Sequence, residues 1–370
     1  MRANNIQKDL VLNDLVYVPS DFVKEEQMIR KGDIVLAMSS GSKDLVGKSA
    51  QADKDINAAF GTFCGLIRAK ENIDSKFLGL YFQTQEYRNF VSYQSKGVNI
   101  CNLKKKDIES LQIPLPPLPT QQAIVARIEA LFAELDKAAK HLRTAQQQLK
   151  TYRQAVLNHW LNNEDGKWEM VKIESVADVV SGYAFKSNLF KDSGKYQIIR
   201  IGNIRPGVIR IKESPVYYDE IPSGTCSKVL LKKKDVVITL TGTRKKRDYG
   251  YTAMVTQENL LLNQRLAYFR FDNKQYDPAF FLYYSWTDSF KDGFFSYETG
   301  NVGQGNVGIK AITKTEIPRP PLPDQHRIVQ EIESRLSQAE AAEASIAEAL
   351  KKTEALRQSI LKKAFSGELV

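Results

Sequence analysis

The chain has 370 residues, enough for two or three domains of ordinary size, and 42% of them are hydrophobic and 26% charged, as in soluble globular proteins. No apolar run approaches the roughly 18 residues needed to cross a bilayer, and the start, MRANNIQKDL, lacks the apolar core of a secretory signal. The three cysteines and three histidines are scattered, which argues against a disulfide framework or a zinc site. We therefore expect a cytoplasmic protein.

The charge balance favours a polyanionic partner. Lys and Arg number 53 against 43 Asp and Glu, which gives a formal net charge of +10. Nucleic acid is one such partner, but the charge alone is weak evidence because many basic proteins bind none.

One segment of the first 112 residues resembles a phosphate-binding motif. Residues 41–49, GSKDLVGKS, have the composition of a nucleotide-binding loop, but the spacing between the glycines is one residue too long. We therefore do not expect nucleotide binding. Lys43 and Lys48 of this loop are candidate DNA contacts, because exposed cations can meet phosphates.

A proline-rich corner at residues 113–119 precedes a long helical pattern. Proline cannot continue a helix and favours extended geometry in the residue before it, so IPLPPLP predicts an extended approach with Thr120 as the N-cap. Neither Pro nor Gly occurs from Thr120 to Leu161. A helix of that length would span about 63 Å.

The region after this helix carries the densest positive charge. Residues 235–240, DVVITL, predict a buried strand because they are β-branched and apolar. Residues 241–250 then predict a loop whose tip holds four consecutive cations: Arg244, Lys245, Lys246 and Arg247. We expect these side chains to contact DNA phosphates or guanine, the alternative being a solvated surface loop.

A second candidate contact lies earlier in the same region. Residues 181–187, SGYAFKS, place aromatic side chains and a cation beside a glycine turn. Tyr183 and Lys186 are the candidate contacts, although the aromatic residues are equally compatible with a core position.

A second proline-rich corner at residues 317–323 shows that the chain contains one unit twice. Residues 113–135 match residues 317–339 at an offset of 204, and Asp324 takes the place of Thr120 as the expected N-cap. The identical residues, numbered in the first copy, are Ile113, Pro114, Pro116, Pro117, Leu118, Pro119, Gln121, Ile124, Val125, Ile128 and Glu129. This agreement is a strong signal of internal duplication.

The duplication extends upstream more loosely. Residues 2–6 match 200–204, and residues 31–36 match 233–238. The first copy lacks about 35 residues that would match 167–199, so we expect its first domain to be truncated at the N-terminus. The expected segments are a first variable domain (1–112), a central corner and helix (113–165), a second variable domain (166–316) and a distal corner and helix (317–370).

Each long helix carries a narrow apolar stripe with residues alternately three and four apart, as in a coiled coil. The simplest burial for each stripe is against the other helix, and the sequence allows parallel or antiparallel pairing. The polar positions Gln146 and Glu343 either fix the register or are simply tolerated. The candidate seam residues are Val125, Ile128, Phe132, Leu135, Leu142, Val329, Ile332, Leu336, Ile346 and Leu350.

Signatures of catalysis are missing from the sequence. No Asn/Asp-Pro-Pro-aromatic motif of an amino-methyltransferase and no Gly-x-Ser-x-Gly elbow occurs. Residues 165–167, Asp-Gly-Lys, have a nuclease-like form but no evident acidic partner. With three histidines in the chain, general acid–base catalysis by His is not expected. We therefore expect a non-catalytic protein without catalytic residues, cofactor or metal.

The chain resembles the specificity subunits of Type I restriction-modification systems. The resemblance rests on the corners IPLPPLP-TQQ and IPRPPLP-DQH with their helices, on SGYAFKS and IIRIGNI, and on the closing AFSGEL. It implies an α+β fold with two mixed α/β target-recognition domains. Two long helices would separate them and pack as an antiparallel coiled coil, giving a pseudo-two-fold internal repeat.

The same resemblance implies the function and the partners. Each domain would read one half of a split double-stranded DNA target, and the helices would set the gap between the halves. Methyltransferase subunits carrying S-adenosylmethionine would dock on the helices. A translocase-nuclease subunit, which uses ATP and Mg, would join for cleavage.

Two other classes stay open from the residues alone. A basic coiled-coil adaptor would bind DNA without sequence preference, and its binding would be salt-sensitive but sequence-blind. A nuclease with a degenerate site would cleave DNA by itself in the presence of a metal.

Overall fold

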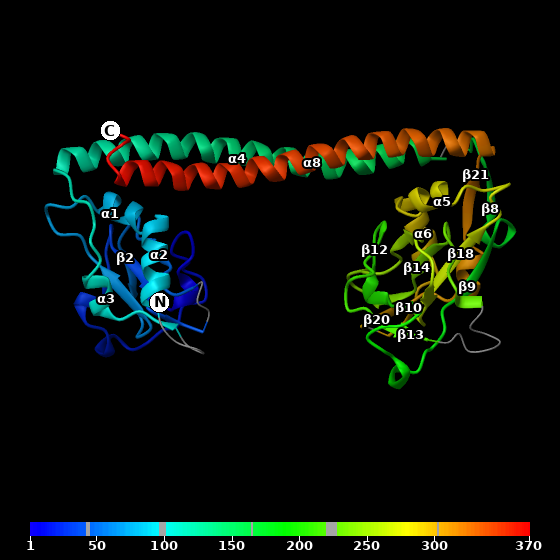
Figure 1. Ribbon diagram of the computed structural model, residues 1–370, viewed down its shortest axis with the longest axis horizontal. Helices are drawn as coiled ribbons and strands as arrows, with labels where there is room; N and C mark the ends of the chain where they lie inside the picture. Colours follow the sequence, from blue (N-terminus) through cyan, green and yellow to red (C-terminus); the bar gives the residue numbers. More distant parts are fainter. Residues whose placement is uncertain (42–44, 96–100, 164–165, 220–227, 302) are drawn as a thin grey trace. The chain divides into compact units, whose positions relative to one another are not determined.

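The computed structural model describes residues 1–370 except 42–44, 96–100, 164–165, 220–227 and 302 (Figure 1). The chain divides into two compact units, which we call unit 1 (Met1–Ala145 with Ser345–Val370) and unit 2 (Gln146–Ala344). The division cuts both long helices, so each unit holds one globular part and one end of each helix. The domain boundaries proposed from the sequence stay predictions.

Unit 1 is built on a three-stranded antiparallel sheet. Its central strand β2 (Ile34–Ala37) pairs with β4 (Ser49–Gln51) and β6 (Cys64–Ile67). Ile34 and Leu36 enter one core and Val35 and Ala37 another, because neighbouring residues of a strand face opposite sides. The remaining elements are β1 (Met28–Ile29), β3 (Ser39–Ser40), β5 (Ile56–Ala59), β7 (Cys101–Asn102), α1 (Ser75–Tyr81), α2 (Gln85–Gln94), α3 (Lys105–Glu109) and 3-10 turns at Ala3–Asn5, Ser20–Phe22 and Glu25–Gln27.

Unit 2 repeats this plan with one strand more. Its strand β14 (Val236–Thr239) confirms the strand expected at 235–240 and lies between β16 (Thr252–Met254) and β18 (Leu266–Phe271). On the far edge of β18 lies β9 (Ala177–Ser181). Val236 and Ile238 enter a core that includes side chains of α5 (Pro278–Tyr284) and α6 (Asp288–Ser296), while Val237 enters the core of the opposite face.

The other elements of unit 2 are shorter. They are β8 (Glu169–Lys172), β10 (Tyr196–Ile199), β11 (Ile204–Arg205), β12 (Val208–Ile209), β13 (Tyr217–Tyr218), β15 (Thr241–Thr243), β17 (Leu260–Leu262), β19 (Thr299–Gly300), β20 (Gln304–Asn306), β21 (Glu316–Arg319), α7 (Ile309–Thr313) and 3-10 turns at Ile173–Ser175, Ser187–Leu189 and Ile201–Asn203.

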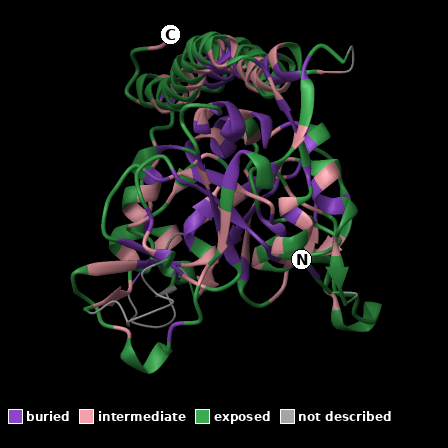
Figure 2. Cartoon of the chain, turned by 90° about the vertical axis from the view of Figure 1, so that its right-hand side faces the viewer, coloured by how far each residue is buried: buried purple, intermediate pink, exposed green. Residues whose placement is uncertain are grey.

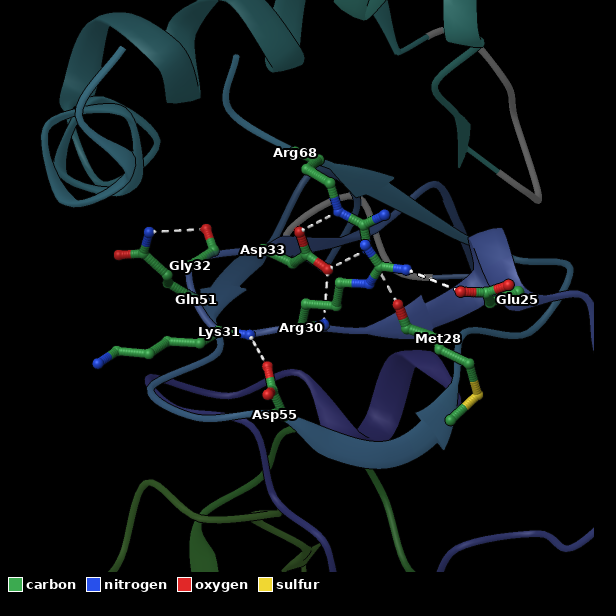
Figure 3. A network of polar contacts seen from close by, with 9 residues as sticks. All are labelled: Glu25, Met28, Arg30, Lys31, Gly32, Asp33, Gln51, Asp55 and Arg68. Atoms are coloured by element: carbon green, nitrogen blue, oxygen red, sulfur yellow. Dashed lines mark hydrogen bonds and ion pairs between the residues drawn. The ribbon is translucent and has the colours of Figure 1, made fainter. Parts of the chain in front are cut away.

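Both units contain the same buried ion pair. In unit 1 the Asp33 carboxylate accepts hydrogen bonds from Nε and Nη2 of Arg68 at 2.8 and 2.6 Å (Figure 3). In unit 2 Asp235 accepts from the same atoms of Arg270 at 2.8 and 2.6 Å. Each aspartate also accepts the backbone N–H of the residue three places earlier, at 2.7 Å. Because both carboxylates are 2% exposed, the pair fixes the residues that begin each central strand.

A second repeated contact joins each globular part to its helix. Gln121 accepts the backbone N–H of Asp74 at 2.9 Å and donates to the carbonyl of Pro116 at 2.8 Å. Gln325 accepts the backbone N–H of Asp277 at 2.8 Å and donates to the carbonyl of Pro320 at 2.8 Å. Both glutamines are fully buried. A glutamine follows each corner because its side-chain amide can accept one hydrogen bond and donate another. It thus satisfies a backbone N–H of the globular part and a backbone carbonyl of the corner at the same time.

The two helices are equal in length. α4 (Leu118–Leu161) and α8 (Leu322–Phe365) each have 44 residues, about 66 Å of helix. They begin two residues before the expected N-caps, so the assignment of Thr120 and Asp324 as N-caps was wrong. The reason is that a proline in the first turn costs the helix no hydrogen bond, so Pro119 and Pro323 lie inside it.

The helices run antiparallel within each unit. In unit 1 Val125, near the start of α4, shares a core with Leu361, near the end of α8, and Asp136 pairs with Arg357. In unit 2 Arg153 of α4 forms an ion pair with Glu343 of α8 at 2.9 Å. The antiparallel option is therefore the one that the chain adopts (Figure 1).

The ten candidate seam residues are all removed at least in part from solvent. The ends of the stripe also pack on the globular parts, since Ile128 shares a core with Phe77 of α1 and Ile332 shares one with strands and helices of unit 2. Buried are Val125, Ile128, Val329 and Ile332; half-buried are Phe132, Leu135, Leu142, Leu336, Ile346 and Leu350.

Burial is concentrated in the globular parts, whereas the long helices are exposed over much of their surface (Figure 2). Among the described residues, no helix combines the length and the apolar character that crossing a membrane requires.

Candidate nucleic-acid interface

The sequence candidates of unit 2 gather at one end of its four-stranded sheet. We call this the loop end: it is where β9 finishes at Ser181, β14 finishes at Thr239 and β18 begins at Leu266. Because these strands are antiparallel neighbours, the segments that follow Ser181 and Thr239 and the turn that precedes Leu266 must emerge side by side.

The basic segment after β14 starts as a strand. Thr241–Thr243 form β15 and pair with Gln304–Asn306 of β20, so the expectation of a loop from Thr241 onward was wrong for these three residues. No local pattern marks this pairing, because the partner strand lies more than 60 positions away. The turn that carries the cations therefore begins at Arg244.

Two of the four cations are held by neighbouring side chains. Arg244 Nε donates to Glu298 Oε2 at 3.0 Å, and Glu298 also accepts the hydroxyl of Tyr249. These two hydrogen bonds, that of Tyr249 first, hold the pKa of Glu298 below its usual value. The guanidinium of Arg247 lies 4.8 Å from the ring centroid of Phe295, within cation–π range.

The other two cations form the exposed tip. Lys245 and Lys246 are exposed and make no ion pair with any residue that the structure describes. Asp248 closes the turn below them by accepting the backbone N–H of Thr243 at 2.6 Å and its hydroxyl at 3.1 Å. The first of these bonds is the main reason why the pKa of Asp248 is lowered. The turn thus presents two ammonium groups on a braced backbone.

The second candidate segment lies at the same end. The backbone N–H of Tyr183 donates to Leu262 at 2.9 Å, and its carbonyl accepts from Gln264 at 2.9 Å. The Tyr183 ring is 37% exposed and contacts the buried ring of Phe185 at 5.1 Å, so one aromatic faces solvent and the other the core. Lys186 is exposed beside them.

The candidates of unit 1 are less informative. Lys43 lies outside the described residues. Lys48 is half-buried and donates from Nζ to Gln7 Oε1 at 2.8 Å. Asp165 of the nuclease-like segment also lies outside the described residues. In the part of the chain that the structure describes, no group of His, Cys, Asp or Glu is arranged to hold a metal ion.

A family model described as "Type I restriction modification DNA specificity domain" matches residues 4–143 and 165–352, which is most of the chain. The chain belongs to this family. It is the DNA specificity subunit of a Type I restriction-modification system, and it works with the other subunits of such a system.

Curated relatives agree along the whole length. The specificity subunit of the Type I restriction enzyme EcoKI from Escherichia coli (strain K12) is 32% identical over 385 residues, which cover 100% of this chain and 82% of that protein. That of StySPI from Salmonella potsdam is 30% identical over 386 residues, with 100% and 82% covered.

Two solved structures show the same fold. One, described as "Structural basis underlying complex assembly and conformational transition of the type I R-M system", matches with a TM-score of 0.77 at 21% identity and covers 99% of this chain and 90% of that chain. The HsdS subunit from Thermoanaerobacter tengcongensis matches with a TM-score of 0.60 at 21% identity and the same coverage.

The structure adds loop-end residues of this specificity subunit that the sequence reasoning missed. An open polar pocket of about 360 Å³ is lined by Thr243, Asp248, Arg265 and Gln304, among others. Arg265 lies in the turn before β18, and no motif marks it. A comparison of the two copies by sequence would not have found it, because residues 61–65 and 263–267, at an offset of 202, share no residue.

Proposed function

We propose that the chain reads a split double-stranded DNA target. One half is read by the loop end of unit 2, and the other by the loop end of unit 1, where β2 ends at Ala37 and β6 begins at Cys64. The observation that carries this proposal is the duplicated pair of buried contacts. Asp33–Arg68 and Gln121 hold unit 1 in the same way that Asp235–Arg270 and Gln325 hold unit 2. Two recognition surfaces, each held by the same set of buried contacts, are suited to two half-sites.

We further propose that phosphates lie at the tip of unit 2. Lys245 and Lys246 are exposed ammonium groups that form no ion pair with any described residue, and such groups bind phosphate as point charges. Arg244 already pairs with Glu298, and Arg247 lies over the ring of Phe295. We therefore assign these two arginines to holding the turn in place and to DNA contacts close to it.

The chemistry of the system is assigned to other chains. We propose that this chain catalyses no reaction and binds no cofactor, because it lacks the sequence motifs of a methyltransferase or an acyl-transfer enzyme. Methyltransferase subunits with S-adenosylmethionine would dock on the exposed faces of α4 and α8. A restriction subunit would supply ATP- and Mg-dependent cleavage, and the complex would act in the cytoplasm.

Methylation mapping tests this proposal. The purified chain alone should transfer no methyl groups, cut no DNA and hydrolyse no ATP. With its methyltransferase subunits added, adenine methylation should appear at one motif made of two fixed halves around an unspecified gap. Methyl transfer by the highly purified chain alone, or methylation without a fixed motif, would contradict the proposal.

A further inference from the structure

The turn before β18 has a counterpart in unit 1. The backbone N–H of Leu240 donates to the carbonyl of Arg265 at 2.9 Å, and in unit 1 the N–H of Met38 donates to the carbonyl of Phe63 at 2.8 Å. Both donors directly follow the central strand, and both acceptors directly precede its neighbour. Phe63 and Arg265 therefore occupy the same backbone position in the two copies.

A third segment completes the match. The carbonyl of Leu240 accepts the N–H of Val307 at 3.0 Å, and the carbonyl of Met38 accepts the N–H of Leu103 at 2.8 Å. These acceptors lead into β15 and β3, which pair with β20 and β7 in the same register. In each unit the turn thus lies beside a short antiparallel strand pair, β3–β7 in unit 1 and β15–β20 in unit 2, where β19 extends the pair to three strands.

The two side chains at this position are exposed and chemically different. Phe63 is 66% exposed, although a phenyl ring in water gains nothing for the fold. Arg265 is exposed, lines the polar pocket with Asp248 and Gln304, and makes no ion pair or side-chain hydrogen bond to any residue that the structure describes. Its φ of +69° is rare for a residue other than glycine, and such backbone strain clusters at functional positions.

We infer that this position reads a base in each half-site, Arg265 contacting a guanine and Phe63 a thymine methyl group. The guanidinium fork matches the O6 and N7 acceptors of guanine in the major groove, and an apolar side chain can cover the C5 methyl of thymine. The inference rests on the proposed division of the target between the two units. Beyond that division, it names one residue in each unit that distinguishes one base from another.

The test uses the complex of the full chain with its methyltransferase subunits. The methylated motif is mapped first, and an exchange of residues 168–316 with those of another specificity subunit assigns its halves to the units. Competition binding then uses duplexes in which single bases are altered. For the wild type, replacing one guanine of the unit 2 half should weaken binding by about 5- to 150-fold. Replacing one thymine by uracil in the unit 1 half should weaken binding about fourfold, the value of one buried methyl group.

Arg265→Asn and Phe63→Ala should abolish these two penalties and leave the others in place. Asn tolerates the left-handed backbone at 265, so the substitution does not strain the turn. Arg265→Lys separates charge from base reading, because it keeps the charge but not the fork. The matched controls are Leu115→Ala and Arg319→Asn, an apolar residue and an arginine at the two corners, 204 positions apart. Both should keep every penalty.

The outcomes are separable. Retention of all guanine penalties in Arg265→Asn, or of all thymine penalties in Phe63→Ala, overturns the inference, and the proposed function stands if the exchange still switches one half-site. An exchange that switches both half-sites overturns the proposed function itself.

Discussion

In unit 2 the strand β14 leads through β15 to a turn with four consecutive cations at 244–247, whereas the residues of unit 1 at the same offset of 202, 42–45, read Ser-Lys-Asp-Leu and carry no net charge. The turn beside them carries Arg265 in one unit and Phe63 in the other. Beneath these differences the buried Asp–Arg pairs and the buried glutamines are the same in both. The duplicated residues therefore hold the fold of each unit, and the exposed loop end is where the two copies have diverged.

The buried ion pairs should give the largest effect. Asp33→Ala or Asp235→Ala leaves an arginine without its partner and should lower the free energy of unfolding of its own unit by about 3 kcal/mol. The three tryptophans, Trp160, Trp168 and Trp286, all lie in unit 2. Tryptophan fluorescence during denaturation should therefore shift for Asp235→Ala and stay nearly unchanged for Asp33→Ala.

Hydrogen exchange should show the reverse pattern for Asp33→Ala, with protection lost in β2 and its neighbours. The exposed Asp53→Ala serves as the control and should change neither unit. Equal fluorescence shifts in both aspartate variants would show that each ion pair does not stabilise its own unit alone.

The glutamine junctions come next. Gln121→Ala or Gln325→Ala leaves a backbone N–H and a carbonyl buried without partners, which should cost about 2 kcal/mol. The amide of Asp74 or of Asp277 should lose protection from hydrogen exchange in the corresponding variant. Gln122→Ala, its exposed neighbour, should behave like the wild type. Unchanged protection in both variants would show that these bonds do not hold the globular parts to the helices.

The tip lysines should give the smallest effect on free energy. Lys245→Ala and Lys246→Ala should each reduce the slope of log binding constant against log salt by about one, with equal losses on specific and non-specific DNA. The exposed Lys172→Ala, in β8 and ahead of the start of β9, should leave the slope unchanged. An unchanged slope in the Lys245, Lys246 double variant would show that the tip is a solvated surface turn that does not contact DNA.

The central strands, the corners and the long helices were largely predictable from the sequence, because the duplication and the helical pattern can be read from runs of neighbouring residues. The strand at 235–240 followed from its β-branched run, and the antiparallel helices from the family resemblance. The loop end was less accessible. Arg265 escaped notice because its role depends on Leu240, 25 positions away, and on a two-residue change of offset between the copies. The ion pair of Arg244 was likewise not predictable, because its partner Glu298 lies 54 positions away and no local pattern connects the two.

Exchange of residues 168–316 shows whether each unit reads its own half of the DNA target. The recognition region of unit 2 is replaced by that of another specificity subunit, and adenine methylation is mapped in cells that express the hybrid with the same methyltransferase subunits. We expect one half of the motif to change, while the other half and the length of the gap stay as they were. A hybrid whose two half-sites both change, or neither, would contradict it.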